Sequence, residues 1–118
     1  AHSSDDLKAW IEDEIAKVSG TTGVDFDIEV KVSGESFVTP QGEFSQMVSD
    51  AVAAETGVTP ALSTSGGTSD ARFIRNHCPV VEVGLVGSSM HQIDERVPVA
   101  DIVTLKAIYT RILKDFFK

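Results

Sequence analysis

The sequence predicts an α/β fold made of two packing units. A strictly alternating apolar segment at 24–32 follows an amphipathic helical segment at 5–18, which indicates a helix and then a half-buried strand. A stretch rich in Gly, Ser and Pro at 33–42 then interrupts the periodic pattern, as a linker between packing units does. Beyond this linker, helical segments alternate with short apolar runs, an order typical of α/β proteins.

The composition describes an acidic globular chain. Its 118 residues are enough for one ordinary domain, and 42% of them are hydrophobic. Ten basic residues against 18 acidic ones give a net charge of −8, so phosphate backbones and anionic bilayers would repel the surface. We therefore expect no nucleic-acid partner and no membrane partner. The single cysteine, Cys78, fits a reducing compartment, and the chain is predicted to be cytoplasmic.

The first unit contains one helix and one strand. Apolar residues recur at helical spacing between 5 and 18, with Ser3 or Ser4 as the cap and Gly20 as the stop. The strand at 24–32 has one apolar face and one charged face, which is typical of an antiparallel sheet. One strand cannot satisfy its own backbone N–H and C=O groups. We therefore expect its neighbours to come from another chain or from upstream sequence, so that this chain is part of a longer one.

The second unit alternates helices with strands. In chain order we expect a helix at 43–56, a strand at 61–64, a short helix at 71–77, a strand at 80–86 and a long helix after Pro98. The 80–86 run is almost entirely apolar, as strands covered on both faces are.

Residues 63–72 (STSGGTSDAR) form the first candidate site, because they run from a strand end into a helix start. Paired glycines let a backbone approach a ligand closely, and the Thr68 and Ser69 hydroxyls can receive a carboxylate at the helix N-terminus. Arg72 can add a bidentate clamp. The same residues also suit an ordinary turn in which Ser69 or Asp70 caps the helix.

His91 is the second candidate, since it follows a predicted buried strand at the place where ligands collect in α/β proteins. Neutral imidazole is a common zinc ligand, but no second ligand stands at a convincing spacing. A surface histidine and a metal ligand both remain open from the residues alone. A serine triad of Ser69, His91 and Asp94 lacks the Gly-x-Ser-x-Gly elbow. Cys78 is interpreted as a buried structural thiol rather than a nucleophile.

Together the two motifs resemble the co-catalytic zinc amidohydrolase family, which includes desuccinylases, acetylornithine deacetylases, aminoacylases and glutamate-type carboxypeptidases. The resemblance is carried by residues 65–73 (SGGTSDARF), 81–84 (VEVG) and 90–95 (MHQIDE). The residues are most similar to those of the desuccinylases. Family members often carry a polar residue at the position of Gly87, so a side-chain contact there is lost or replaced.

The resemblance implies a zinc-binding catalytic domain interrupted by a lid domain that also forms a homodimer. Residues 1–35 would be the end of the lid and dimerisation domain, 36–42 the crossover linker, and 43–118 the C-terminal segment of the catalytic domain. The expected fold class is therefore α/β, the C-terminal segment of a zinc-peptidase-like domain plus the last helix and strand of an antiparallel α+β lid.

The resemblance also implies roles for individual residues. His91 matches the histidine that closes one of two zinc sites. Gly67 and Thr68 match the loop that holds the substrate carboxylate, and Ser69 and Arg72 belong to the same motif in supporting roles. The remaining zinc ligands and the general base lie upstream in the family. We therefore expect no catalytic residue here, weak or no zinc binding, and no turnover by this chain alone.

The implied reaction of the intact enzyme is hydrolysis of N-succinyl-LL-2,6-diaminopimelate to succinate and LL-2,6-diaminopimelate, with two zinc ions per subunit, in lysine and diaminopimelate biosynthesis. One alternative is another small-molecule hydrolase of the same family, such as an acetylornithine deacetylase or a dipeptidase. A second is a non-catalytic α/β interaction module that dimerises through its 24–32 strand. In either case, we expect this chain alone to self-associate or to pair with upstream sequence.

Overall fold

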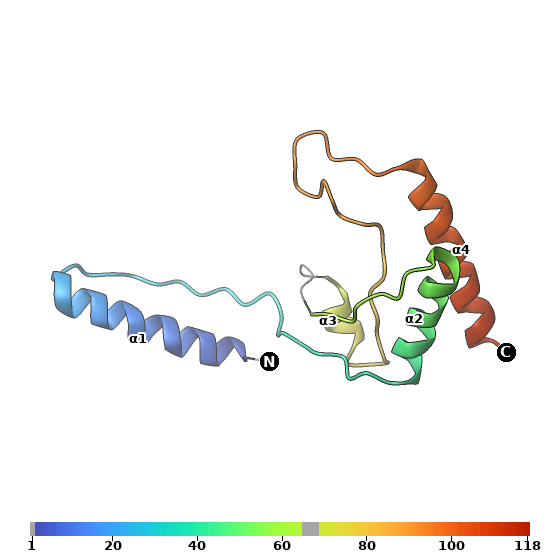
Figure 1. The fold of residues 1–118 in the computed structure, drawn as a ribbon. Coiled ribbons are helices and arrows are strands. Elements are labelled where there is room, and N and C mark those ends of the chain that lie inside the picture. The colour runs from blue at the N-terminus through green and yellow to red at the C-terminus, as the bar shows by residue number, and fades with distance from the viewer. Residues whose placement is uncertain (1, 65–68) are drawn as a thin grey trace.

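The structure, a computed structural model, describes residues 2–64 and 69–118 as helices joined by long loops (Figure 1). The helices are α1 (Ser4–Thr22), α2 (Glu43–Thr56), α3 (Ala71–Ile74) and α4 (Val99–Phe116). Each of the four helical segments expected from the sequence is therefore confirmed as a helix, although α3 is shorter than predicted. None of them, among the residues described, is both long and apolar enough to cross a membrane.

The first helix, α1, begins at a reciprocal cap. The Ser3 hydroxyl accepts a hydrogen bond from the Asp6 N–H at 3.0 Å, and the Asp6 carboxylate accepts one from the Ser3 N–H at 3.1 Å. The helix continues through Gly20 and ends at Gly23, which adopts the left-handed conformation with φ of 72°. The prediction of Gly20 as the stop is therefore wrong, because the residue that adopts the left-handed cap lies three positions later.

The core of the second unit lies between α2 and α4, which run side by side (Figure 1). Val48 and Ala51 of α2 and Ile108 of α4 are buried. At the edge of this contact, Arg111 Nε lies 2.5 Å from Glu55 Oε1. The helix α2 ends at Thr56, as predicted, and is followed by Gly57 in the left-handed conformation with φ of 73°. These two helices are the only pair in contact within the described part of the chain.

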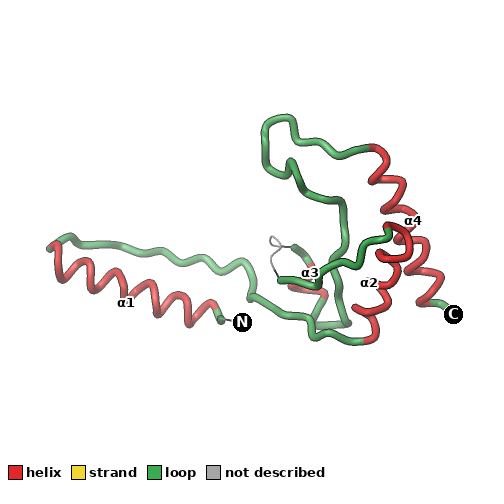
Figure 2. Tube along the Cα trace, in the orientation of Figure 1, coloured by secondary structure: helices red, strands yellow, loops and turns green. Residues whose placement is uncertain are grey.

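The strands predicted at 24–32, 61–64 and 80–86 are not confirmed, because residues 2–64 and 69–118 contain helices and loops but no strand (Figure 2). The 24–32 segment runs back along α1 as an unpaired chain (Figure 1). A strand is defined by the ladder of hydrogen bonds to a neighbour, and these segments have no neighbouring strand in the described residues. The sheet expected from the α/β prediction is therefore absent from this part of the molecule.

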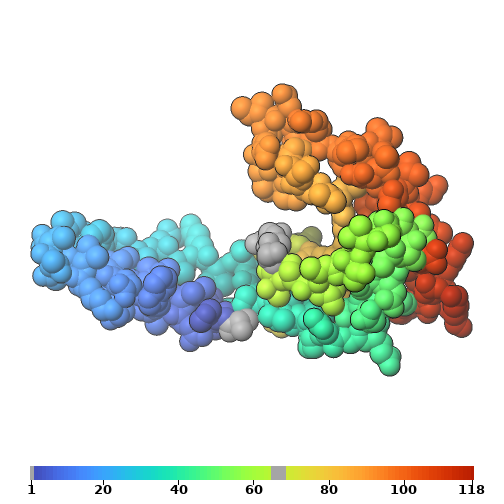
Figure 3. All heavy atoms as spheres, in the orientation of Figure 1, coloured from blue at the N-terminus to red at the C-terminus, as the bar shows by residue number. Residues whose placement is uncertain are grey.

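The molecule has two lobes, one formed by α1 and the 24–32 segment and the other by the rest (Figure 3). The Glu35 carboxylate closes the first lobe by accepting hydrogen bonds from the Ser4 hydroxyl and from the Ser4 N–H, the latter at 2.9 Å. The radius of gyration is 20.0 Å. A compact domain of this length would have a value of roughly 13–14 Å, so the two lobes share little packed surface.

Candidate functional site

The first candidate motif leads into α3. The Ser69 hydroxyl accepts a hydrogen bond from the Ala71 N–H at 3.1 Å, and Ala71 is buried. The Ser69 hydroxyl therefore holds a turn just before this short helix, whose N-cap residue is Asp70 and has no side-chain capping bond. Gly67 and Thr68, the predicted carboxylate-binding residues, lie outside the described residues.

Arg72 extends from α3 into the joint between the two lobes. Its guanidinium carbon lies 4.7 Å from the centre of the Phe73 ring. Its aliphatic stem lies against Gly34, where an added Cβ would approach Arg72 Cδ to 2.9 Å. The Arg72 Nε is buried and has no hydrogen-bond partner among the described residues. A buried unpaired N–H is costly, so an incoming acceptor such as a carboxylate oxygen would be stabilised there.

Ser69 and Arg72 line the same open hollow, which has a volume of about 680 Å³. Its walls come from the 33–39 segment on one side and from residues 61–64 and 80–82 on the other. The structure thus brings together two residues of the first motif. His91 is not among the lining residues, so the two candidate motifs do not form one site within the described part of the chain.

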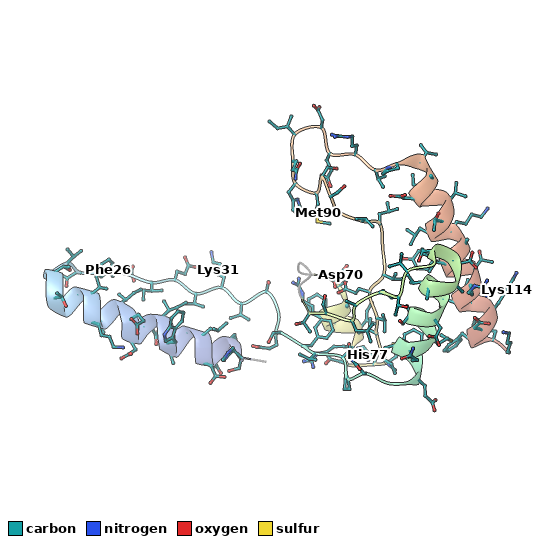
Figure 4. The ribbon with its side chains drawn as sticks, in the orientation of Figure 1. Phe26, Lys31, Asp70, His77, Met90 and Lys114 are labelled. Carbon is teal, nitrogen blue, oxygen red and sulfur yellow. The ribbon has the colours of Figure 1, made fainter. Side chains whose placement is uncertain are left out.

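His91 lies on the loop that arches from the 80–86 segment to α4, and Figure 4 marks this loop at Met90. Its side chain is exposed, and its backbone is left-handed with φ of 61°. Asp94, three residues later, is left-handed too, with φ of 59°. An added Cβ on Gly87 would lie 2.6 Å from Met90 Cε, so glycine leaves room for the methionine side chain to fold back over the loop.

The described residues do not fit a complete metal site. No group of three or more His, Cys, Asp or Glu side chains is close enough to hold a metal ion in residues 2–64 and 69–118. Catalytic zinc usually has three protein ligands. His91 can therefore supply one ligand, and the other ligands would have to come from elsewhere.

Three further residues differ from what the sequence suggested or were missed. Cys78 is exposed, so the prediction of a buried thiol is wrong for this chain. The Gly34 contact with Arg72 was not predicted, because nothing local links residues 38 positions apart. Ser89 is buried in the His91 loop, while its neighbour Ser88 is exposed, and the residue pattern does not distinguish the two.

Residues 4–115 match the model of peptidase family M20/M25/M40. The chain belongs to this peptidase family. Enzymes of the M20 family are typically metal-dependent. An exposed histidine such as His91 is a side chain that can bind a metal ion.

Curated relatives of this M20 chain are succinyl-diaminopimelate desuccinylases of bacteria. The protein of Cereibacter sphaeroides (strain ATCC 17029 / ATH 2.4.9) is 63% identical over 117 residues, which cover 99% of this chain and 31% of that relative. The protein of Ruegeria pomeroyi is 62% identical over 116 residues, 98% of this chain and 30% of the relative. The protein of Roseobacter denitrificans is 59% identical over 117 residues, with 99% and 31% covered. The chain thus spans about a third of the length of the relatives it matches.

Proposed function

We propose that this chain is the C-terminal part of a succinyl-diaminopimelate desuccinylase, an M20 hydrolase that releases succinate from N-succinyl-LL-2,6-diaminopimelate. The observation that carries the proposal is the identity of 59–63% with proteins of that name over almost the whole chain. Since the chain spans about 31% of their length, hydrolysis requires residues that this chain does not contain.

Within the intact enzyme we assign residues 1–35 to the lid and dimerisation domain, 36–42 to the crossover, and 43–118 to the α/β catalytic domain. The unpaired 24–32 segment supports this division, because it has the pattern of a sheet strand without a neighbour in the described chain. The intact enzyme would be a homodimer with two zinc ions per subunit. Exposed Cys78 suits a reducing compartment, and we place the enzyme in the cytoplasm.

The residues of this chain would bind and orient rather than transfer protons. His91 offers an exposed imidazole as one ligand of a metal. A zinc ion held there would supply Lewis-acid chemistry for the hydrolysis of the amide. Arg72 would direct its unpaired Nε at a substrate carboxylate, with Ser69 holding the turn from which α3 starts. Gly67 and Thr68 would provide backbone contacts to the same carboxylate.

The experiment is the variant His91→Ala in the full-length protein, with His77→Ala as the matched control because His77 is also an exposed histidine in a turn. We expect His91→Ala to retain one zinc ion per subunit in place of two, measured by elemental analysis. Its kcat on N-succinyl-diaminopimelate should fall by a factor of about 100 or more. The control should keep both ions. Two zinc ions and full activity in His91→Ala would overturn the assignment.

Substrate choice is tested on the same full-length protein. We expect kcat/KM to be highest for N-succinyl-diaminopimelate and much lower for N-acetylornithine and for dipeptides. A preference for either of the latter would replace the desuccinylase with another hydrolase of the M20 family.

A further inference from the structure

A buried serine closes the loop that carries His91. The Ser89 hydroxyl donates a hydrogen bond to the Arg96 carbonyl oxygen at 2.6 Å and accepts one from the Arg96 N–H at 2.9 Å. Ser89 is only 8% exposed, in a loop whose other residues are mostly exposed. One side chain therefore satisfies both backbone groups of a residue seven positions away and holds the two ends of the loop together.

The loop needs such a closure because its backbone is unfavourable by itself. His91 and Asp94 both have φ near +60°, a region that residues with a Cβ rarely adopt. Residues in this region keep that conformation only where the surrounding structure holds them there. We call the two hydrogen bonds between Ser89 and Arg96 the clasp. The clasp encloses both left-handed residues, since Ser89 precedes His91 and Arg96 follows Asp94.

Further hydrogen bonds also lie within the loop. The Gln92 N–H donates to the Ser89 carbonyl oxygen at 3.1 Å, and Arg96 Nη1 donates to the Asp94 carbonyl oxygen at 3.2 Å. Both of these bonds include Ser89 or Arg96, the two residues of the clasp. Among the described residues, the hydrogen bonds that hold the His91 loop are thus formed within the loop itself.

We infer that Ser89 is a positioning residue for His91, whose hydroxyl clasp on Arg96 fixes the left-handed backbone from which the imidazole is presented to a metal ion. The inference rests on the proposed function, in which His91 is a zinc ligand. Groups that orient a metal ligand change metal affinity by roughly 10- to 100-fold when they are removed.

The test uses the full-length protein and a set of substitutions at one position. Ser89→Thr keeps the hydroxyl, and Ser89→Val has nearly the same shape as threonine without it. Ser89→Ala removes the hydroxyl with no added bulk. Ser88→Ala is the matched control, because the neighbouring Ser88 is exposed and its described contact is a carbonyl oxygen that accepts from Gln92 Nε2 at 3.3 Å.

Two measurements are made on each variant. Zinc affinity is measured by competition with a chelator, and amide hydrogen exchange at Arg96 is measured in the metal-free protein. We expect Ser89→Ala and Ser89→Val to bind one of the two zinc ions about 10- to 100-fold more weakly and to exchange the Arg96 amide faster. Ser89→Thr and Ser88→Ala should behave like the wild type in both measurements.

The outcomes separate this inference from the proposed function. If His91→Ala loses a zinc ion while Ser89→Ala and Ser89→Val keep wild-type affinity, the positioning role is wrong and the proposed function stands. If His91→Ala keeps both ions, the proposed function fails and the positioning role fails with it. If Ser89→Ala does not fold, the comparison of threonine with valine decides, and equal zinc affinities in that pair overturn the inference.

Discussion

Serine hydroxyls set the local backbone geometry at several places in the described part of this molecule. Ser3 caps α1, Ser69 accepts from the Ala71 N–H at the start of α3, and Ser89 closes the His91 loop. Each hydroxyl accepts a hydrogen bond from a backbone N–H that has no partner in a helix or sheet. Few side chains are buried in the described part of this chain. These short-range hydrogen bonds therefore hold local conformations that side-chain packing would hold in a compact domain.

The cap of α1 has a predictable pH dependence. Hydrogen bonds from the Ser3 side chain and then from the Ser3 backbone hold the pKa of Asp6 below its ordinary value of 3.8. Because the folded pKa is lowered, the stabilisation is present above the unfolded pKa and is lost as the pH falls through the folded value. As the pH falls below the ordinary aspartate value of 3.8, the first turn should therefore fray, with a loss of helical ¹³Cα shifts in its residues.

Two substitutions provide the controls for this titration. Asp6→Asn should reduce the pH dependence of the first turn, since the amide still accepts a hydrogen bond but carries no titrating group. The dependence that remains would come from Glu35, because its hydrogen bonds from Ser4 hold its pKa below the ordinary value of 4.5. Asp5→Asn, at a neighbouring acidic position in the first turn, should leave the pH dependence in place. An unchanged first turn in the wild type at low pH would contradict the capping argument.

Helices were the elements that the sequence predicted well, because their signals are local. The helical periodicity of the second unit predicted a helix at 43–56, and the structure has α2 at Glu43–Thr56. Pro98 likewise precedes α4 directly. The end of α1 was misplaced because Gly20 and Gly23 are both plausible stops, and only the backbone conformation distinguishes them.

The strands and the site depended on contacts between distant residues, which one sequence does not reveal. Segment 24–32 has the alternation of a strand, but a strand also needs a partner. Carboxylate binding by Arg72 stays a prediction, while its contact with Gly34 arises from the path of the chain between the lobes. In the same way, His91 was recognised from its motif, but the clasp between Ser89 and Arg96 depends on the conformation of the loop.

The two glycines of α1 give opposite predictions for the same change. Gly20 lies inside the helix with no atom within 4 Å of an added Cβ, so Gly20→Ala should stabilise the helix by about 0.5–1 kcal/mol. Gly23 has φ of 72°, so Gly23→Ala should destabilise the helix end by about 1–2 kcal/mol. Far-UV circular dichroism against temperature measures both, and a gain in helix content in Gly23→Ala would refute the assignment of the cap.

At the scale of the whole molecule, the chain exposes far more apolar surface than a compact domain does. Its principal extents are 62, 36 and 20 Å. The 24–32 segment alone exposes five large apolar side chains by 37–55%, namely those of Val24, Phe26, Ile28, Val30 and Val32. Contiguous apolar surface of this kind marks a region that another surface covers.

We predict that the purified chain self-associates through this segment, because an alternating strand with free backbone groups is a template for pairing. Light scattering should give a mass above that of the monomer that rises with concentration. Ile28→Lys should shift the chain toward the monomer by placing a charge on the apolar face. Asp27→Lys, which places the same lysine on the polar face, should not. A wild-type monomer at all concentrations would count against the prediction.

The bonds between Ser4 and Glu35 bear on how such pairing would proceed. They tie together two points 31 residues apart and turn α1 and the returning segment into a closed ring of chain. An incoming strand would therefore meet a template whose ends are already anchored, and part of the loop-closure entropy has been lost beforehand. Loss of the hydrogen bonds between Ser4 and Glu35 would leave the side chains of the 24–32 segment unchanged. Pairing with another strand would then cost more conformational entropy, because the segment would start from a less restricted state.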